Sequence, residues 1–208
     1  QQALLFGREK IAGIDRSRCV GCLKCVEACP SGALKAWGED MSVSDVMAVI
    51  EKDRNYYERS GGGVTVSGGD PLMQSDFTRE LLKACRDAGI HTCLESTFNI
   101  DWKIAEDVVR YADLIISDIK HMDSEIHRKY TGAGCEKVLE NLRRLALDGH
   151  DMILRIPLIP GINDDMQNIS RTADFIEQNI GERLKTLQLL SFMRMGEEKC
   201  MSLDRVYE

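Results

Sequence analysis

The spacing of apolar positions along this chain changes from a helical period to an alternation of strands and helices. Val46, Met47 and Ile50 recur at helical spacing and predict a helix over residues 42–57. Beyond it, the predicted strands cover residues 64–66, 91–94, 114–119, 152–159 and 184–192, and the predicted helices cover 75–88, 104–111, 136–147 and 169–180. Five strands alternating with helices predict an α/β fold with a parallel sheet, either open or closed into a barrel.

Residues able to bind a ligand follow the predicted strands, where parallel α/β folds collect their chemistry. These loops are Ser67-Gly68-Gly69-Asp70-Pro71, Glu95-Ser96-Thr97, Asp118-Ile119-Lys120-His121, residues 160–164 and residues 193–196. Glycines directly after a strand let the backbone approach a ligand closely, although a tight turn between strand and helix explains them equally well. A lone histidine such as His121 is as often a satisfied polar residue as a catalytic one.

Three charged residues stand out on or directly after the predicted strands. Asp118 and Lys120 are two residues apart, so their side chains share one face of the strand, either as a binding pair or as a simple surface ion pair. Arg155 lies in an apolar run that predicts a buried strand, where a guanidinium group requires a carboxylate partner. That partner is either a ligand or an aspartate of the barrel itself.

A cysteine-rich loop, CVGCLKCVEACP, precedes the first predicted helix. Its spacing is Cys19-x2-Cys22-x2-Cys25-x3-Cys29 followed by proline, which is typical of bacterial ferredoxins that bind a [4Fe–4S] cluster through cysteine thiolates. A zinc ribbon would pair one C-x2-C with a second further along the chain, and a disulfide framework is typical of very small secreted proteins. The loop therefore predicts an iron–sulfur cluster, with zinc as the main alternative.

Composition narrows the class of protein further. The 208 residues are 43% hydrophobic and 29% charged, with a net charge of -7 that argues against nucleic acid as a partner. No apolar run approaches the roughly 20 residues of a membrane helix, and the first residues resemble no signal or transit peptide. The remaining cysteines are scattered and are expected to be reduced thiols, namely Cys85, Cys93, Cys135 and Cys200. A cytoplasmic protein without membrane or nucleic-acid partners is expected.

Four segments together resemble the glycyl radical enzyme activating enzymes of the radical S-adenosylmethionine superfamily. They are the cysteine loop, SGGGVTVSGGDPLMQ (60–74), SDIKHMDSEIHRKYTG (117–132) and RIPLIPGIND (155–164). The resemblance implies a partial (β/α)6 TIM-like barrel over residues 41–208, lacking its first strand, and a ferredoxin-like [4Fe–4S] insert over residues 1–40. It also implies that the full-length protein generates a 5′-deoxyadenosyl radical from S-adenosylmethionine and abstracts hydrogen from a glycine of a partner, the glycyl radical enzyme, with electrons from a flavodoxin or ferredoxin-type donor.

The resemblance also assigns cofactor-binding roles to individual residues. Gly68, Gly69 and Asp70 stand at the GGEP motif that holds the methionine amino group, and Asp70 replaces the more frequent glutamate. Glu95 stands at the acidic position after the next strand, which in the family is a ligand for a monovalent cation beside the methionine carboxylate.

Further along the chain, Asp118 and Lys120 match a D-x-K signature that contacts S-adenosylmethionine, and Arg155 matches an arginine near the carboxylate of that cofactor. One departure concerns the last strand, where the family usually has histidine before R-x-G and this chain has Met193. That change indicates a subgroup that serves a different glycyl radical enzyme.

A second departure from the family is an absence. The C-x3-C-x2-C motif, which binds the reactive cluster in the family, occurs nowhere in these residues. Cys25-x3-Cys29 fits its first step, but position 32 is glycine. In the family the motif lies upstream of the insert, so we expect the chain to begin past it and the cysteine loop to be an electron relay. Many members carry two cysteine sets, and only one is present here, which leaves Cys29 without a second cluster. This chain alone is therefore expected to bind one cluster and not to cleave S-adenosylmethionine.

Two other classes of function fit the same residues. A plain electron-transfer protein of ferredoxin type would have a reducible cluster and no affinity for S-adenosylmethionine. An inactive subunit would dock a glycyl radical partner without performing chemistry. Neither the identity of the glycyl radical enzyme nor the oligomeric state follows from the sequence.

Overall fold

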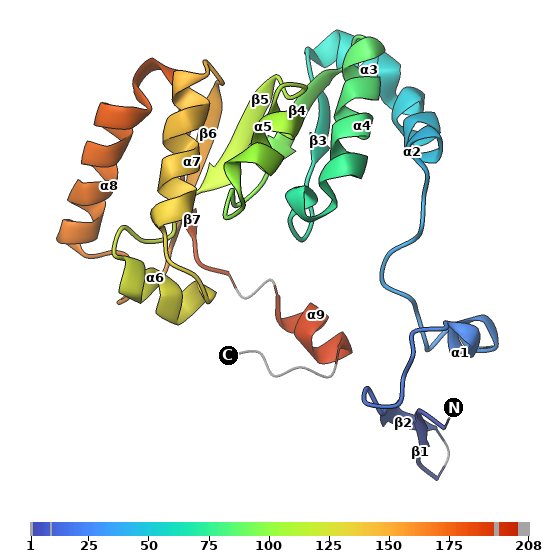
Figure 1. Ribbon diagram of the computed structural model, residues 1–208. Helices are drawn as coiled ribbons and strands as arrows, with labels where there is room; N and C mark the ends of the chain where they lie inside the picture. Colours follow the sequence, from blue (N-terminus) through green and yellow to red (C-terminus); the bar gives the residue numbers. More distant parts are fainter. Residues whose placement is uncertain (1, 9, 194–195, 204–208) are drawn as a thin grey trace. The chain divides into compact units, whose positions relative to one another are not determined.

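The computed structural model describes residues 2–8, 10–193 and 196–203, and its contacts divide the chain into two units, residues 1–41 and residues 42–208 (Figure 1). The two units are described separately below. The loop at residues 193–196, singled out by the sequence, falls partly outside the described residues, at Arg194 and Met195.

The first unit consists of a hairpin and a cysteine-bearing turn. Strands β1 (Leu4–Phe6) and β2 (Ile11–Ile14) pair antiparallel, and the short helix α1 (Lys24–Glu27) carries Cys25. None of the described side chains in residues 2–41 is buried. The sequence did not predict the hairpin, because three and four residues are too few to show an alternating pattern.

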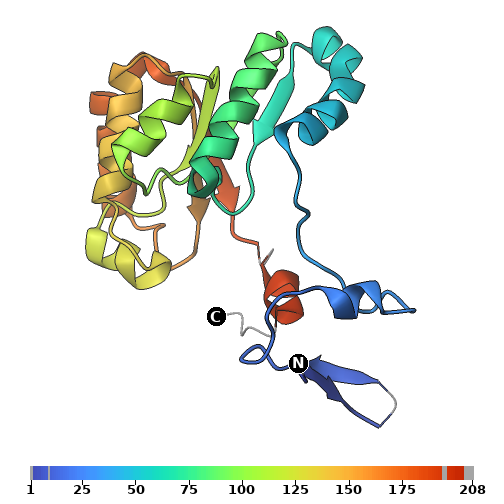
Figure 2. The ribbon, with the colours of Figure 1, turned by 45° about the vertical axis from the view of Figure 1, so that its right-hand side comes forward.

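The second unit is built on a parallel sheet whose strand order follows the chain, β3-β4-β5-β6-β7. The strands are β3 (Gly63–Val66), β4 (His91–Glu95), β5 (Leu114–Asp118), β6 (Met152–Leu158) and β7 (Leu184–Ser191). All five were predicted from the sequence, and the predicted α/β class is confirmed. Because neighbouring strands are parallel, their carboxyl ends lie along one edge of the sheet (Figure 2).

Helices connect the strands, and α4, α5 and α7 lie on the same side of the sheet (Figure 1). The α-helices of the unit are α2 (Val43–Ile50), α3 (Arg54–Ser60), α4 (Ser75–Asp87), α5 (Trp102–Val109), α6 (Ser124–Thr131), α7 (Glu136–Leu147), α8 (Met166–Asn179) and α9 (Glu197–Ser202). Three single-turn helices complete it, at Glu51–Asp53 (η1), Pro71–Gln74 (η2) and Gly181–Arg183 (η3). The predicted helix over 42–57 is interrupted by η1, and α6 and α9 were not predicted. No helix in the described part of the chain has the length and apolar character needed to cross a membrane.

The hydrophobic core lies between the sheet and its helices. Strand β6 shows how it is filled, since Met152 and Leu154 are fully buried and Ile156 is nearly so, while the intervening Ile153 and Arg155 are only half-buried. Alternation along a strand sends successive side chains to opposite faces. One face of the sheet therefore packs against helices, and the opposite face carries polar side chains.

Candidate functional site

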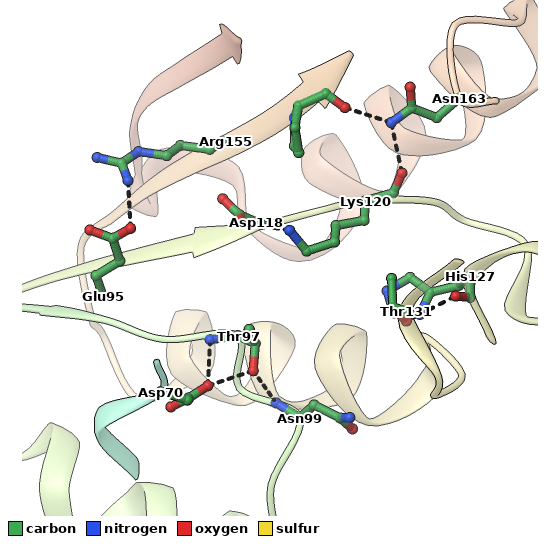
Figure 3. A network of polar contacts seen from close by, with 11 residues as sticks. Asp70, Glu95, Thr97, Asn99, Asp118, Lys120, His127, Thr131, Arg155 and Asn163 are labelled. Carbon is green, nitrogen blue, oxygen red and sulfur yellow. Dashed lines mark hydrogen bonds and ion pairs between the residues drawn. The ribbon is translucent and has the colours of Figure 1, made fainter. Parts of the chain in front are cut away.

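An ion pair spans three strands at the carboxyl edge of the sheet. Arg155 on β6 donates from Nη1 to Glu95 Oε1 of β4 at 2.8 Å (Figure 3). Its Nε also donates to Gln188 Oε1 of β7 at 3.0 Å. The Arg155 and Glu95 side chains retain 25% and 36% of their accessible surface. The carboxylate partner that the sequence required for Arg155 is thus Glu95 of the sheet, and both groups remain open to a ligand.

A second ion pair lies on the intervening strand. Lys120 donates from Nζ to Asp118 Oδ2 at 2.9 Å, and the two side chains retain 38% and 31% of their surface (Figure 3). Asp118 and Arg155 are register partners across β5 and β6, and Arg155 and Gln188 are partners across β6 and β7. Register therefore brings residues far apart in the sequence onto one face, as the strand-end pattern predicted.

The glycine loop follows β3 on the same edge. Gly68 and Gly69 have φ angles of 90° and 52°, in the left-handed region that favours glycine, and a side chain at either would meet no atom within 4 Å. This space lets a ligand reach the peptide groups of both glycines. The loop fits the predicted role of backbone groups that bind a polar head group.

Asp70 has a more specific task in this structure than the sequence indicated. Its Oδ1 accepts from Leu72 N at 3.1 Å and from Ser96 Oγ at 2.8 Å. Its Oδ2 accepts from Thr97 N at 3.0 Å and from Thr97 Oγ1 at 2.6 Å (Figure 3). The carboxylate therefore ties the loop after β3, which carries the two glycines, to the loop after β4.

Buried asparagines hold the next loops, and sequence reasoning missed their role. Asn163, which is 1% exposed, donates from Nδ2 to Lys120 O at 2.9 Å and to Pro157 O at 2.7 Å, and its Oδ1 accepts from Ile159 N at 2.7 Å. Asn168 in turn donates from Nδ2 to Asn163 O at 3.0 Å. A buried amide that satisfies three backbone groups fixes their geometry. The position of Lys120 thus depends on Asn163.

A cavity of about 780 Å³ opens beside Lys120, between the ends of β5, β6 and β7 and helix α6. Its polar lining residues include His121, His127 and Asn163, whereas most of its surface is apolar. The apolar lining comprises Ile126, Tyr130, Pro157, Ile159, Ile162, Leu189, Leu190, Phe192 and Met193. Such a mixture suits a ligand with a flat apolar part and a few polar groups. Met193, where the resembled family usually has histidine, lies in this wall.

The sequence did not single out His127 and left the role of His121 open. His121 Nδ1 accepts from Asp123 N at 2.9 Å, so the ring is oriented by the turn that begins α6. His127 Nδ1 lies 2.9 Å from Thr131 Oγ1 (Figure 3). It also lies 2.6 Å from Ala133 O. Both rings are buried, at 6% and 7% exposure, and both serve the fold of the α6 region.

The first unit contains its own cavity, of about 600 Å³, lined by Cys19, Cys22 and Cys25. Arg16, Lys24 and Lys35 also line it, together with apolar residues, and the lining includes no carboxylate. Within the described residues, no three His, Cys, Asp or Glu side chains are grouped to hold a single metal ion. Three cysteines beside cations, with no carboxylate in the lining, fit an anionic iron–sulfur cluster.

Cys29 differs from the other three cysteines of the loop. It does not line the cavity, and its Sγ lies 3.6 Å from Ser31 Oγ. Hydrogen bonds from the backbone of Leu34 and from the Ser31 side chain lower the pKa of its thiol to about 7. These contacts favour the thiolate form of Cys29.

The second unit also fits S-adenosylmethionine by its donor set. That molecule carries a carboxylate, an amino group and an adenosine. Lys120 and Arg155 provide cations, Asp118 and Glu95 provide carboxylates, and the glycine loop provides open peptide groups. The apolar cavity next to Lys120 is large enough for a nucleoside.

Comparison with known proteins gives consistent results. The model of the family described as "Radical SAM superfamily", where SAM denotes S-adenosylmethionine, matches residues 22–173. The chain is 55% identical over 208 residues to the (2S)-3-sulfopropanediol dehydratase activating enzyme of Klebsiella oxytoca, covering all of this chain and 66% of that protein. It is 36% identical to the 4-hydroxyphenylacetate decarboxylase activating enzyme of Clostridioides difficile strain CD196, covering 99% of this chain and 65% of that protein. The chain thus spans slightly less than two thirds of these relatives.

A solved structure shares the fold. The crystal structure of a domain of pyruvate-formate lyase-activating enzyme from Bacteroides vulgatus ATCC 8482 superimposes with a TM-score of 0.59 at 31% identity. The match covers 68% of this chain and 92% of that domain.

Proposed function

Because the chain belongs to the radical SAM superfamily, we propose that it is the S-adenosylmethionine-binding part of an enzyme that activates a glycyl radical enzyme. The observation that carries the proposal is the convergence of Glu95, Asp118, Lys120 and Arg155 on one face at the carboxyl edge of the sheet. Partly exposed charges of both signs, next to an open glycine loop, suit the amino-acid end of S-adenosylmethionine.

The residues of this chain bind and orient the cofactor. The peptide groups of Gly68 and Gly69 receive the methionine amino group, and Asp70 holds their loop in place through Ser96 and Thr97. S-adenosylmethionine, together with a reduced reactive cluster, supplies the hydrogen abstraction characteristic of this superfamily. The cysteine motif for that cluster is not among these 208 residues, so the cysteines of this chain serve another role.

The strand-end charges set the orientation of the methionine carboxylate. Lys120 and Arg155 attract it, and Asp118 and Glu95 keep the two cations in fixed positions while the site is empty. Glu95 retains enough exposed surface to take a monovalent cation beside that carboxylate once Arg155 turns toward the ligand.

The cysteine loop of the first unit passes electrons. Its cavity is lined by cations, which favour a reduced, more negatively charged cluster. A flavodoxin or ferredoxin-type protein in the cytoplasm is the proposed electron donor. The protein substrate is a glycyl radical enzyme, and the relative at 55% identity favours a dehydratase of a sulfonated diol.

Glycyl radical formation tests this proposal. A longer form of the protein that includes the C-x3-C-x2-C motif would be mixed anaerobically with (2S)-3-sulfopropanediol dehydratase, S-adenosylmethionine and a reductant. We expect the electron paramagnetic resonance doublet of a glycyl radical in the wild type and its loss in Lys120→Met. Lys103→Met, on the outer helix α5, is the matched control and should leave the doublet intact. Absence of the doublet with every glycyl radical enzyme offered, despite an intact reduced cluster, would refute the proposed activity.

A further inference from the structure

The cavity of the first unit separates the cysteines into three and one. Cys19, Cys22 and Cys25 line it, whereas Cys29 does not. We propose that these three cysteines alone hold the cluster and that Cys29 is not its fourth ligand, so that one iron keeps an exchangeable coordination position. This inference rests on the proposed iron–sulfur function of the loop, and it concerns which cysteines of the loop ligate the cluster.

The backbone of the loop is shaped around the three cysteines. Gly21 and Leu23 have φ angles of 66° and 56°, and they flank Cys22 on both sides. Leucine rarely adopts this left-handed conformation, so neighbouring structure or a ligand must maintain it. Left-handed residues in a tight turn are typical of backbone nests that bind iron–sulfur clusters and phosphate. The strain thus lies where the cluster would be held.

The charged side chains that line the cavity also favour a cluster held by these three cysteines. Arg16, Lys24 and Lys35 line the same space as the three cysteines, and the lining includes no carboxylate. A cluster with cysteine thiolates is anionic, and nearby cations stabilise it. The cavity therefore offers both the ligands and the counter-charges of a cluster without Cys29.

Cys29 follows the C-terminal end of α1, beyond the C-cap residue Ala28. Its peptide N–H donates to Val26 O at 3.2 Å, and its sulfur contacts Ser31 Oγ at 3.6 Å. In ferredoxins with two cysteine runs, the fourth cysteine of each run ligates the cluster of the other run. Cys29 likewise lies outside the lining of the cavity that the other three cysteines share. Three thiolates then account for three irons, and the fourth iron takes water or a thiol from outside the loop.

Cluster content of two variants tests the assignment. The full 208-residue chain would be reconstituted anaerobically with iron and sulfide, in wild-type form and as Cys29→Ala and Cys22→Ala. We expect Cys29→Ala to retain wild-type iron and acid-labile sulfide, and Cys22→Ala to lose most of both. Loss of iron from Cys29→Ala to the same extent as from Cys22→Ala would overturn the proposal.

Selective iron exchange provides the second readout. Ferricyanide removes one electron from the wild-type cluster, and an iron without a thiolate ligand then leaves as a ferrous ion, so that a [3Fe–4S] cluster remains. Re-addition of 57Fe under reducing conditions should label that one position, and Mössbauer spectra should show a single iron environment. Uniform labelling, or a cluster that resists iron loss, would contradict the proposal and leave the proposed function intact. A chain that binds zinc but no iron would overturn both.

Discussion

The two units of this molecule differ in how many apolar side chains they bury, and therefore in what can stabilise them. In the unit at 42–208, Leu82, Leu94, Ile115 and Leu154 are fully buried between the sheet and its helices. In the unit at 1–41, none of the described side chains is buried, and Phe6 and Trp37 are 73% and 65% exposed. Units of about 40 residues rarely fold on a hydrophobic core, and metal ligands commonly supply the missing stability. The proposed cluster of the cysteine loop would therefore stabilise the first unit as well as pass electrons.

The same contrast applies to the two sites. Three charged residues of the site are each next to a buried residue in their strands: Glu95 to Leu94, Asp118 to Ser117 and Arg155 to Leu154. Core packing thus fixes the strand-end charges before any ligand binds. The cysteines have no such support, because no described side chain of their unit is buried, and the proposed cluster would fix their final positions. Experiments can therefore distinguish the strand-end site, which is ordered before its ligand binds, from the cysteine loop, which we expect to become ordered only with its cluster.

Removal of iron should produce the largest effect and act on one region only. Without iron, amide hydrogen exchange in the loop at 19–29 should accelerate by at least about tenfold, equivalent to about 1.4 kcal/mol, while strands β5 and β6 remain protected. Cys22→Ser should reproduce this change in the presence of iron, and Cys200→Ser should not. Mass-spectrometric hydrogen exchange measures both regions together. Equal acceleration in the sheet would show that the cluster stabilises the whole chain.

Replacement of Arg155 should weaken cofactor binding without disturbing the first unit. Arg155→Leu removes a charged donor, worth about 1.5–3 kcal/mol, and should lower the affinity for S-adenosylmethionine by roughly 10- to 100-fold. Arg143→Leu on α7, where Arg143 pairs with Glu140, is the control for loss of a positive charge. Equilibrium dialysis with labelled cofactor gives both affinities. Unchanged binding in Arg155→Leu would assign this arginine a purely structural role.

Replacement of Asp70 should reduce stability of the barrel. In Asp70→Asn, the amide nitrogen cannot accept the bonds that one carboxylate oxygen receives from Ser96 or Thr97, so the free energy of unfolding should fall by about 1–3 kcal/mol. Asp76→Asn, at a side chain that is 89% exposed, should change it by less than about 0.5 kcal/mol. Urea denaturation followed by circular dichroism measures the difference. Equal stability of the two variants would mean that the loops after β3 and β4 are held by other contacts.

The smallest expected effect is a pH dependence of barrel stability at His150. Burial of this ring at the end of α7 lowers its pKa in the folded chain. The unfolded chain therefore binds the proton first as the pH falls below about 6.5, so stability is lost in that range. His150→Gln should lose less stability than the wild type between pH 7 and pH 5, measured by urea denaturation at each pH. A parallel loss in both proteins would exclude His150 as the cause.

Sequence patterns predicted the sheet well because its strands are regular. Period-two alternation placed Asp118 and Lys120 on one face, and the apolar run around Arg155 predicted its need for a carboxylate. The identity of that carboxylate was not predictable, because Glu95 and Arg155 lie 60 residues apart and meet only across β5. The bonds from Asp70 to the next loop likewise depend on tertiary structure.

Helix α6 was missed although its signals were present. Asp123 caps its first turn by accepting from two backbone N–H groups, and Gly132 ends it in the left-handed conformation. The segment between them has few apolar residues, so the helical period was weak. The hairpin at 4–14 and the division of the cysteines into three and one depend on turns of a few residues, which composition does not specify.

The most direct test of the account measures both regions in the same samples. Iron content and binding of labelled S-adenosylmethionine would be determined for the 208-residue chain, a triple Cys19→Ser, Cys22→Ser, Cys25→Ser variant, and an Asp118→Asn, Lys120→Met variant. We predict that the cysteine variant loses iron and keeps cofactor binding, and that the strand-end variant keeps iron and loses cofactor binding. Loss of both properties in both variants, or no saturable cofactor binding by the wild type, would contradict the account.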